Sequence, residues 1–201
     1  MGTNGSADGD TRAAIMAATD RTLRQHGYAD LSIAKIADEA EMSKSALYYH
    51  YEDKDDLLVA FLDHVVDRFL DDVAAEEDTD PEATLRSFID RLLPPSLDEE
   101  GYAFYVALFE LRSQAPHNPA YRERFTETDR LLRETLAEHL ERGIDQGRFR
   151  SVDPDATAQL LVAAIAGGMV ERVTTDGEDP APALRAGLDA YIGAHVLAES
   201  P

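Results

Sequence analysis

The spacing of apolar residues along the chain predicts an all-α protein. Apolar positions recur three and four residues apart, and no useful stretch alternates apolar and polar residues as a half-buried strand would. Proline, glycine and acidic stretches divide this pattern into about nine helices, without an internal repeat. The predicted helices cover about 10–26, 33–40, 44–50, 53–73, 81–93, 98–115, 120–146, 156–174 and 180–197.

The most informative stretch is 32–58, which predicts two short helices joined by a tight turn and followed by a third helix. Ser32 and Ser43 each stand directly before a predicted helix, where a hydroxyl can accept a free backbone N–H of the first turn. The helix over 44–50 is too short to be stable alone, so packing of residues such as Leu47 and Tyr51 must hold it.

The outward face of the predicted helix over 44–50 carries polar and aromatic residues. A helix of this width fits the major groove of B-DNA, and side chains of these types supply phosphate donors, base-edge hydrogen bonds and flat apolar contacts. Lys54 follows in the first turn of the next helix, where a helix N-terminus favours phosphate. The stretch therefore predicts a helix-turn-helix, with DNA contacts at Ser32, Ser43, Lys44, Ser45, Tyr48, Tyr49, His50 and Lys54.

These residues resemble the signature of the TetR family of transcriptional regulators, SK-x-x-LYYHF-x-x-K-x-x-LL. The matching positions are Ser43, Lys44, Leu47, Tyr48, Tyr49, His50, Tyr51, Lys54, Leu57 and Leu58. Two positions depart from the family. Glu41 stands where the turn usually has glycine, and Ala46 replaces a threonine or serine that often contacts phosphate. Glu41 is costlier than glycine in a left-handed backbone and is mildly repulsive to DNA.

The resemblance implies a homodimeric repressor that binds double-stranded operator DNA and is released by a small molecule. It also implies a DNA-binding domain over 10–53 and a ligand-sensing and dimerisation domain over 54–201. Residues 1–9, rich in glycine, serine, asparagine and aspartate, predict a disordered tail before them. Helix 10–26 would brace the helix-turn-helix, with Gly27 at its end. The alternative is a regulator controlled by a protein partner that docks on the acidic C-terminal bundle.

An effector pocket is predicted from polar groups among apolar walls, which suit a mostly hydrophobic ligand with one anionic or hydrogen-bonding end. Most of these residues are of types that also form ordinary cores. For a cationic ligand, Glu110 is the one obvious buried carboxylate. The predicted lining is Phe61, Val65, Phe69, Tyr102, Tyr105, Phe109, Arg112, Ile165 and Met169.

The segment 160–170 is apolar nearly all round, unlike a surface helix of a monomer. With the last helix it predicts a two-fold, four-helix contact between subunits, although burial within one chain is the alternative. The predicted interface residues are Leu160, Ala164, Gly167, Gly168, Leu188, Tyr191 and Ile192.

Composition narrows the function further. The chain has no cysteine, its six histidines are scattered, and it has neither a Gly-rich phosphate loop nor an HExxH spacing, so we expect no enzyme, metal or cofactor. No uninterrupted run of about 18 apolar residues is present, which favours a cytoplasmic protein without a membrane anchor.

The net charge of −21 is unusual for a DNA-binding protein. Most of the acidic excess lies beyond residue 52, since residues 1–52 hold five basic and eight acidic groups. Three lysines beside sixteen arginines, with abundant aspartate, indicate a halophilic host whose cytoplasm screens this charge.

Overall fold

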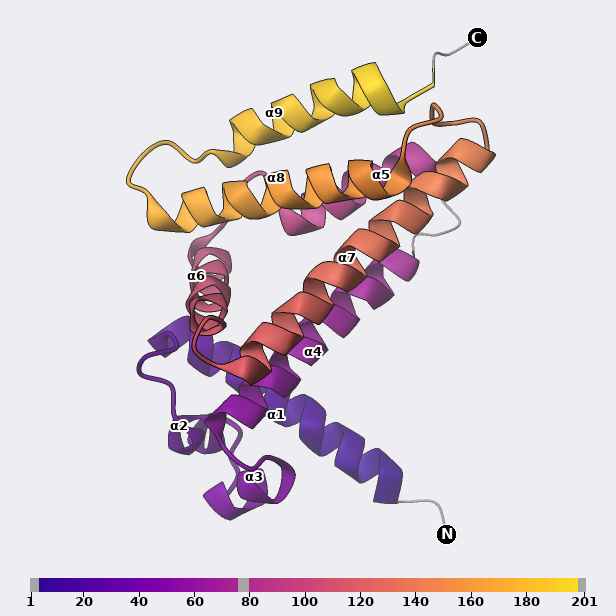
Figure 1. Ribbon diagram of the computed structural model, residues 1–201. Helices are drawn as coiled ribbons and strands as arrows, with labels where there is room; N and C mark the ends of the chain where they lie inside the picture. The colour runs from indigo at the N-terminus through magenta and orange to yellow at the C-terminus, as the bar shows by residue number, and fades with distance from the viewer. Residues whose placement is uncertain (1–3, 76–79, 199–201) are drawn as a thin grey trace. The chain divides into compact units, whose positions relative to one another are not determined.

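The computed structural model describes residues 4–75 and 80–198, and the regular structure there is helical apart from one isolated bridge between Phe149 and Leu197 (Figure 1). This confirms the predicted all-α class. The helices are α1 (Asn4–His26), α2 (Ile33–Glu39), α3 (Lys44–His50), α4 (Lys54–Ala74), α5 (Pro81–Leu92), α6 (Glu99–Gln114), α7 (Pro119–Asp145), α8 (Pro154–Thr174) and α9 (Ala181–Tyr191), followed by a π-helical turn (Ile192–Val196).

The first helix begins earlier than predicted. We expected it to begin at about Asp10, after a disordered tail over 1–9, but α1 begins at Asn4. The expected start was wrong because glycine and aspartate were interpreted as breakers, although each costs a helix only about 1 kcal/mol or less. Residues 1–3 of the predicted tail lie outside the described residues.

The chain forms two compact units that do not follow the predicted boundary at residue 53. We call them the head unit, which runs to Asp67 and includes Asp98–Phe125, and the bundle unit, formed by Arg68–Leu97 and the chain from Thr126 onward. The head unit therefore contains the first two thirds of α4, all of α6 and the start of α7. The long helices α4 and α7 each contribute residues to both units.

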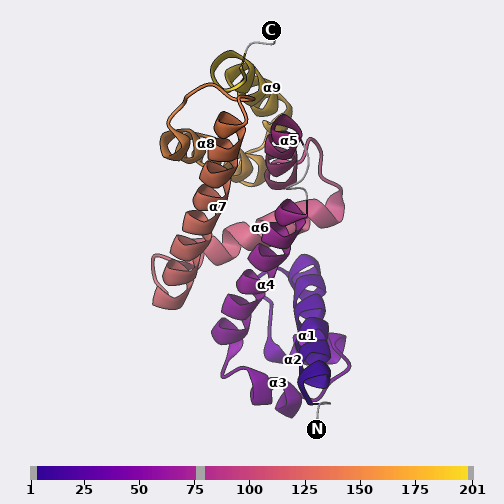
Figure 2. The same ribbon diagram turned by 90° about the vertical axis from the view of Figure 1, so that its right-hand side faces the viewer.

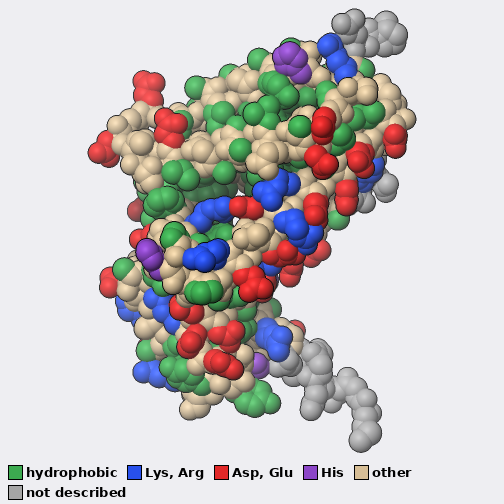
Figure 3. All heavy atoms as spheres, viewed as in Figure 1, with side chains coloured by type: hydrophobic (Ala, Val, Ile, Leu, Met, Phe, Trp, Pro, Cys, Tyr) green, Lys and Arg blue, Asp and Glu red, His purple; other side chains and the backbone are tan. Residues whose placement is uncertain are grey.

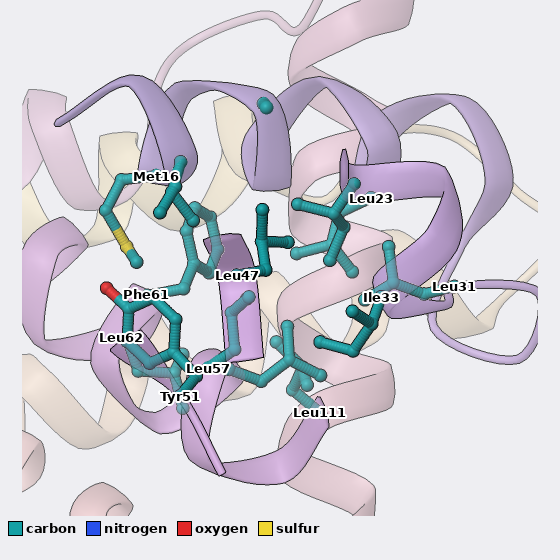
Figure 4. Close-up of a cluster of buried hydrophobic side chains, with 14 of the residues drawn as sticks. Met16, Leu23, Leu31, Ile33, Leu47, Tyr51, Leu57, Phe61, Leu62 and Leu111 are labelled. Atoms are coloured by element: carbon teal, nitrogen blue, oxygen red, sulfur yellow. The ribbon is translucent and has the colours of Figure 1, made fainter. Parts of the chain in front are cut away.

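The head unit is built on one apolar core, to which every helix of the helix-turn-helix contributes (Figure 4). Met16 and Leu23 point into it from α1, Ile33 from α2, Leu47 from α3 and Leu57 from α4. Leu47 and Leu57 are fully buried, as the register of the motif predicts. This shared core holds α3, which has only seven residues and could not persist alone.

Serine caps begin both short helices, as predicted. The Ser32 hydroxyl oxygen accepts the Lys35 N–H at 3.3 Å, and the Ser43 hydroxyl oxygen accepts the Ala46 N–H at 3.2 Å. Each serine thereby satisfies a backbone donor that has no partner within the helix. These caps fix where α2 and α3 begin and hence which side chains α3 turns outward.

Helices α5, α7, α8 and α9 of the bundle unit lie together (Figure 2), and their buried side chains form a second apolar core. Asp153 caps α8 through the Ala156 N–H at 3.0 Å, with Pro154 in the first turn, as the sequence predicted. Helix α9 packs along α8. Core residues include Leu85, Phe88, Leu136, Leu140, Leu161, Ile165, Leu188 and Ile192.

Helix α8 is long and apolar enough, by length and composition, to cross a membrane. In the described residues it is the one helix that meets this test, and 39% of its most apolar window is buried. A core helix of a soluble protein passes the same test, and α8 packs against α9 within the bundle unit.

Candidate DNA-binding surface

Helix α3 turns large polar and aromatic side chains toward solvent. Tyr49 is 85% exposed and Tyr48 is 57% exposed, although tyrosine rings usually bury much of their area. Lys44 and Ser45 are exposed beside them in the first turn. The opposite side of the helix is fixed by Leu47, which has no exposed area. The structure thus brings four of the predicted contact residues onto one outward face.

His50 differs from the other predicted contacts because it is half-buried. Its ring lies edge-on to Tyr49, with centroids 5.2 Å apart, and 6.3 Å from the ring of Tyr51. Tyr51 itself is buried in the head core. His50 therefore orients the exposed Tyr49 ring and offers only part of its own ring to a ligand.

The outward face of α3 has the chemistry of a major-groove reader. An α-helix fits the groove, an ammonium group binds phosphate, and hydroxyl groups contact base edges. The tyrosine rings add flat apolar surface for thymine methyl groups. The caps leave the hydroxyl protons of Ser32 and Ser43 free for phosphate, because capping uses only the oxygen lone pairs.

Carboxylates surround this face, which makes its electrostatics unusual. Glu39 is paired with Arg21 of α1 at 2.5 Å, so its charge is locally compensated. Glu41, Glu52 and Asp53 are exposed. Lys44 is consequently the one basic side chain on the outward face of α3.

Lys54 has a different partner from the expected phosphate. Its ammonium group donates to the backbone carbonyl of Tyr28 at 2.8 Å and lies 4.1 Å from the centroid of the Tyr28 ring. Burial lowers the pKa of Lys54, and the nearby Asp55 carboxylate opposes that shift. Sequence reasoning missed this contact because Tyr28 and Lys54 are 26 residues apart and belong to no common pattern.

The residues predicted to line an effector pocket are divided between the two units. Six belong to the head unit, and Phe69, Ile165 and Met169 belong to the bundle unit. Phe61 is 1% exposed within the head core and Ile165 is 4% exposed within the bundle core. Both are structural core residues in this state. The pocket prediction for them is therefore replaced by ordinary packing.

Helix α6 keeps the more accessible members of that set. Tyr102 is 45% exposed, and Tyr105 and Phe109 are partly exposed. The Arg112 guanidinium lies 4.9 Å from the centroid of the Phe125 ring. Glu110, the expected partner of a cationic ligand, instead accepts the backbone N–H of Tyr28 at 2.8 Å.

The residues predicted to form the subunit contact differ in their exposure, and two of them are core residues of their own chain. Leu160 is 49% exposed and Gly167 is exposed, whereas Leu188 and Ile192 are buried in the bundle core of their own chain. Gly168 is buried too, because a Cβ there would lie 2.3 Å from a methyl carbon of Leu184 on α9. Its missing side chain serves the packing of α9 on α8 within one chain. Ala164 and Tyr191 are half-buried.

The exposed faces of α8 and α9 are mostly small and apolar (Figure 3). An open groove of about 520 Å³ lies between them, floored by alanine and glycine and rimmed by Glu171, Glu178 and Asp179. It contains three predicted interface residues, Ala164, Gly167 and Gly168, and none of the predicted effector residues. Its position agrees with a packing surface better than with an enclosed effector pocket.

A capped recognition helix presented outward from a helix-turn-helix core defines a DNA-binding regulator. Residues 15–61 match the family of bacterial regulatory proteins called tetR, and residues 81–197 match the C-terminal part of the BetI-type transcriptional repressors. The chain therefore belongs to the TetR family of transcriptional regulators, which are not enzymes.

Relatives of known structure or function agree with this assignment. The crystal structure of a TetR transcription regulator from Haloarcula marismortui is 40% identical, with a TM-score of 0.83 over 94% of this chain and 99% of that one. A putative regulator from Saccharomonospora viridis in complex with choline shares the fold, with 24% identity and a TM-score of 0.77 over 95% of this chain and 100% of that one. The transcriptional repressor AcnR of Corynebacterium efficiens is 24% identical over 83% of each chain.

Proposed function

We propose that the chain is a homodimeric repressor whose two α3 helices bind successive major-groove faces of a pseudo-palindromic operator. The observation that supports this most is the exposure of Tyr49 and Tyr48 on a short helix that is otherwise fixed by caps and by Leu47. Rings this exposed contribute little to the packing of their own chain. The AcnR relative is a repressor, which supports repression over activation.

The proposed site consists of Lys44, Ser45, Tyr48 and Tyr49, with Ser32, Ser43 and His50 at its edges. Each base contact contributes about 1–3 kcal/mol, and a dimer makes it twice, so Tyr48→Ala should weaken operator binding at least about 30-fold. Lys44→Ala, which removes a phosphate contact from each half-site, should also weaken binding. The probe is a duplex that the wild-type protein selects from a random-sequence pool, with affinity measured by fluorescence anisotropy. Tyr102→Ala is the matched control, since it truncates an exposed tyrosine on α6.

Dimerisation through α8 and α9 is supported by the exposed apolar face of these helices. Leu160 and Val170 are 49% and 42% exposed, and the small residues Ala163, Gly167 and Gly187 beside them are exposed too. Such a face allows close approach of a second pair of helices. Leu160→Glu should therefore shift the protein from dimer to monomer in sedimentation equilibrium at molar salt. A wild-type chain that sediments as a monomer under these conditions would refute the interface.

Release from the operator by a small, mostly hydrophobic effector is the proposed mode of control. The accessible aromatic residues of α6 suit such a ligand, and the choline bound by the Saccharomonospora viridis regulator makes a quaternary ammonium group one candidate head. Since Glu110 is already occupied by the Tyr28 N–H, binding of a cation would depend on aromatic rings. Calorimetric titration with choline, with a fatty acyl chain as the comparison, tests the two ligand classes.

Control by a protein partner is the alternative. It would be favoured if neither ligand class changed operator affinity while a host protein bound the acidic bundle unit. The net charge of −21, the shortage of lysine and the likeness to a Haloarcula protein support action in a high-salt cytoplasm. The partners proposed here are thus operator DNA, a second copy of the chain and a small effector, without a membrane.

A further inference from the structure

Tyr28 lies in the loop between α1 and α2 and contacts three further helices of the head unit, α4, α6 and α7. Its backbone N–H donates to the carboxylate of Glu110 on α6 at 2.8 Å, and its carbonyl accepts from the ammonium group of Lys54 on α4 at 2.8 Å. Its ring lies edge-on to that of Tyr121 on α7, with centroids 6.5 Å apart and an interplanar angle of 81°. One loop residue therefore joins α4, α6 and α7.

Asp55, next to Lys54 in the first turn of α4, makes a second set of contacts with the start of α7. Its carboxylate accepts the Tyr121 hydroxyl and the Asn118 side-chain amide, each at 2.9 Å. Asn118 also caps α7, because its side-chain oxygen accepts the Ala120 N–H at 3.0 Å. Burial and the adjacent Asp55 raise the pKa of Tyr121, so its hydroxyl stays protonated and remains a donor.

Gly27 makes room for the contact with Glu110. It ends α1 in a left-handed conformation, with φ of 67°, and a Cβ there would lie 3.2 Å from a carboxylate oxygen of Glu110. The glycine thus has two roles, of which only the helix-ending role was predicted from the sequence. We call the whole set the latch: Tyr28, Lys54, Asp55, Glu110, Asn118 and Tyr121.

Two residues of the latch flank the helix-turn-helix, one before α2 and one after α3. Tyr28 stands four residues before Ser32, which caps α2, and Lys54 stands four residues after His50, which ends α3. The apolar core already supplies stability, and exchanging water for protein partners gives each hydrogen bond a net contribution of only about 1 kcal/mol. Directional polar contacts, in addition, restrict the elements they join to a single orientation.

We propose that the latch positions the recognition helix for DNA, and that its six members are positioning residues rather than DNA contacts. The proposal rests on the proposed function, in which α3 binds the operator. It assigns Lys54 to Tyr28 instead of to a phosphate. Because two heads must bind half-sites at a fixed separation, a loosened head binds the correct operator more weakly and discriminates less against a wrong separation.

Tyr121→Phe tests this with a minimal change, since it removes one hydroxyl and keeps the ring. The probes are the duplex selected by the wild-type protein and the same duplex with one base pair added between the half-sites. We expect Tyr121→Phe to lose about tenfold in affinity for the selected duplex and less for the lengthened one, so that the ratio of the two affinities falls. Asn118→Ala removes the other partner of Asp55, so it should also lower the affinity for the selected duplex and the ratio of the two affinities.

Ile89→Val is the stability control, because it removes one buried methyl group from the bundle core and leaves the latch intact. It should change neither affinity nor the ratio at temperatures well below unfolding. Tyr121→Phe binding both duplexes as the wild type does, or losing affinity equally on both, would overturn the latch. A wild-type protein that selects no duplex would overturn the proposed function and the latch together.

Lys54→Gln provides a second, independent measurement. A lysine that contacts phosphate contributes about one to the slope of log affinity against log salt, so its loss would reduce that slope by about one per half-site. A positioning lysine leaves the slope unchanged and lowers the ratio between the two duplexes. The salt slope of this variant therefore separates the latch from the phosphate contact, and a reduced slope with an unchanged ratio contradicts the latch.

Discussion

Glu41 holds the turn between α2 and α3 in a left-handed backbone conformation, with φ of 54°. The turn ends α2 with two backbone bonds, from the Glu41 N–H to Asp38 and from the Met42 N–H to Ala37 at 2.9 Å. This pattern usually places glycine where Glu41 stands, because a Cβ collides with the neighbouring backbone in that conformation. The residue therefore costs stability and also places a carboxylate beside the DNA-binding face.

Glu41→Gly should raise the free energy of unfolding by about 0.5–1 kcal/mol, because relief of the left-handed strain exceeds the entropy cost of glycine. Chemical unfolding at fixed protein concentration measures this. Glu41→Gln separates charge from backbone, since it removes the carboxylate and keeps the Cβ. It should leave stability unchanged yet strengthen operator binding at low salt. Equal stabilisation by both variants would show that charge, and not φ, is the cause.

Gly143 shows how an element can depend on one missing side chain. It lies inside α7, where glycine is unfavourable, yet a Cβ there would be 2.1 Å from a ring carbon of Phe149. That ring is 3% exposed and belongs to the bundle core. The chain after α7 folds back over this point, with the Arg148 and Phe149 N–H groups donating to the Gly143 carbonyl at 2.9 and 3.0 Å.

Gly143→Ala should lower the free energy of unfolding by about 2 kcal/mol, because the collision with a buried ring outweighs the helix propensity gained. Adding Phe149→Leu makes room for the methyl group, so the double variant should be more stable than the sum of the single changes predicts. Gly9→Ala is the matched control. It is also a helical position but meets nothing within 4 Å, so it should stabilise slightly. Destabilisation by both alanines would point to backbone effects alone.

Local sequence signals predicted the helices well. Contacts between residues far apart in the sequence were not predicted. The start of α8 was predicted from Asp153 and Pro154, and the end of α7 was predicted from Gly147, whose φ is 68°. Both predictions succeeded because capping is decided within a few residues. The use of Gly143 and Gly168 was not visible, since each accommodates a side chain from a different segment. The contacts of the latch were not predicted, for the same reason. Its members lie far apart in the sequence, 82 residues between Tyr28 and Glu110 and more between Tyr28 and Tyr121, and no periodic pattern links them.

The sequence predicted which side chains of α3 point outward, but not the surroundings of the other candidate residues. Lys44, Tyr48 and Tyr49 lie outward because the period of a seven-residue helix, together with Leu47 inward, determines their direction. A division into two domains was predicted, but its place within α4 and α7 was not, because it depends on which apolar residues of these helices meet which core. For that reason Phe61 and Ile165, which the sequence placed in one pocket, belong to different cores.

The charge of the molecule sets how operator binding depends on salt. Residues 32–56 hold three lysines and seven carboxylates, and Lys54 is bonded within the head. The slope of log affinity against log salt is about −0.9 for each phosphate contacted, and reaches about −10 for a repressor with many basic contacts. With about two lysines available to each half-site, we expect a slope no steeper than about −4 for the dimer in KCl titrations monitored by anisotropy.

Removing head carboxylates should make that slope more negative, because their repulsion of phosphate acts at low salt and is screened within about 3 Å at 1 M. The double variant Glu41→Gln with Glu52→Gln should thus strengthen operator binding at 0.1 M KCl, where charges are screened only beyond about 10 Å. It should change operator binding little at molar salt. Glu138→Gln with Glu141→Gln makes the same charge change on exposed residues of the bundle unit and should leave the slope unchanged. If both pairs change the slope alike, net charge governs binding, and the local surface around α3 does not.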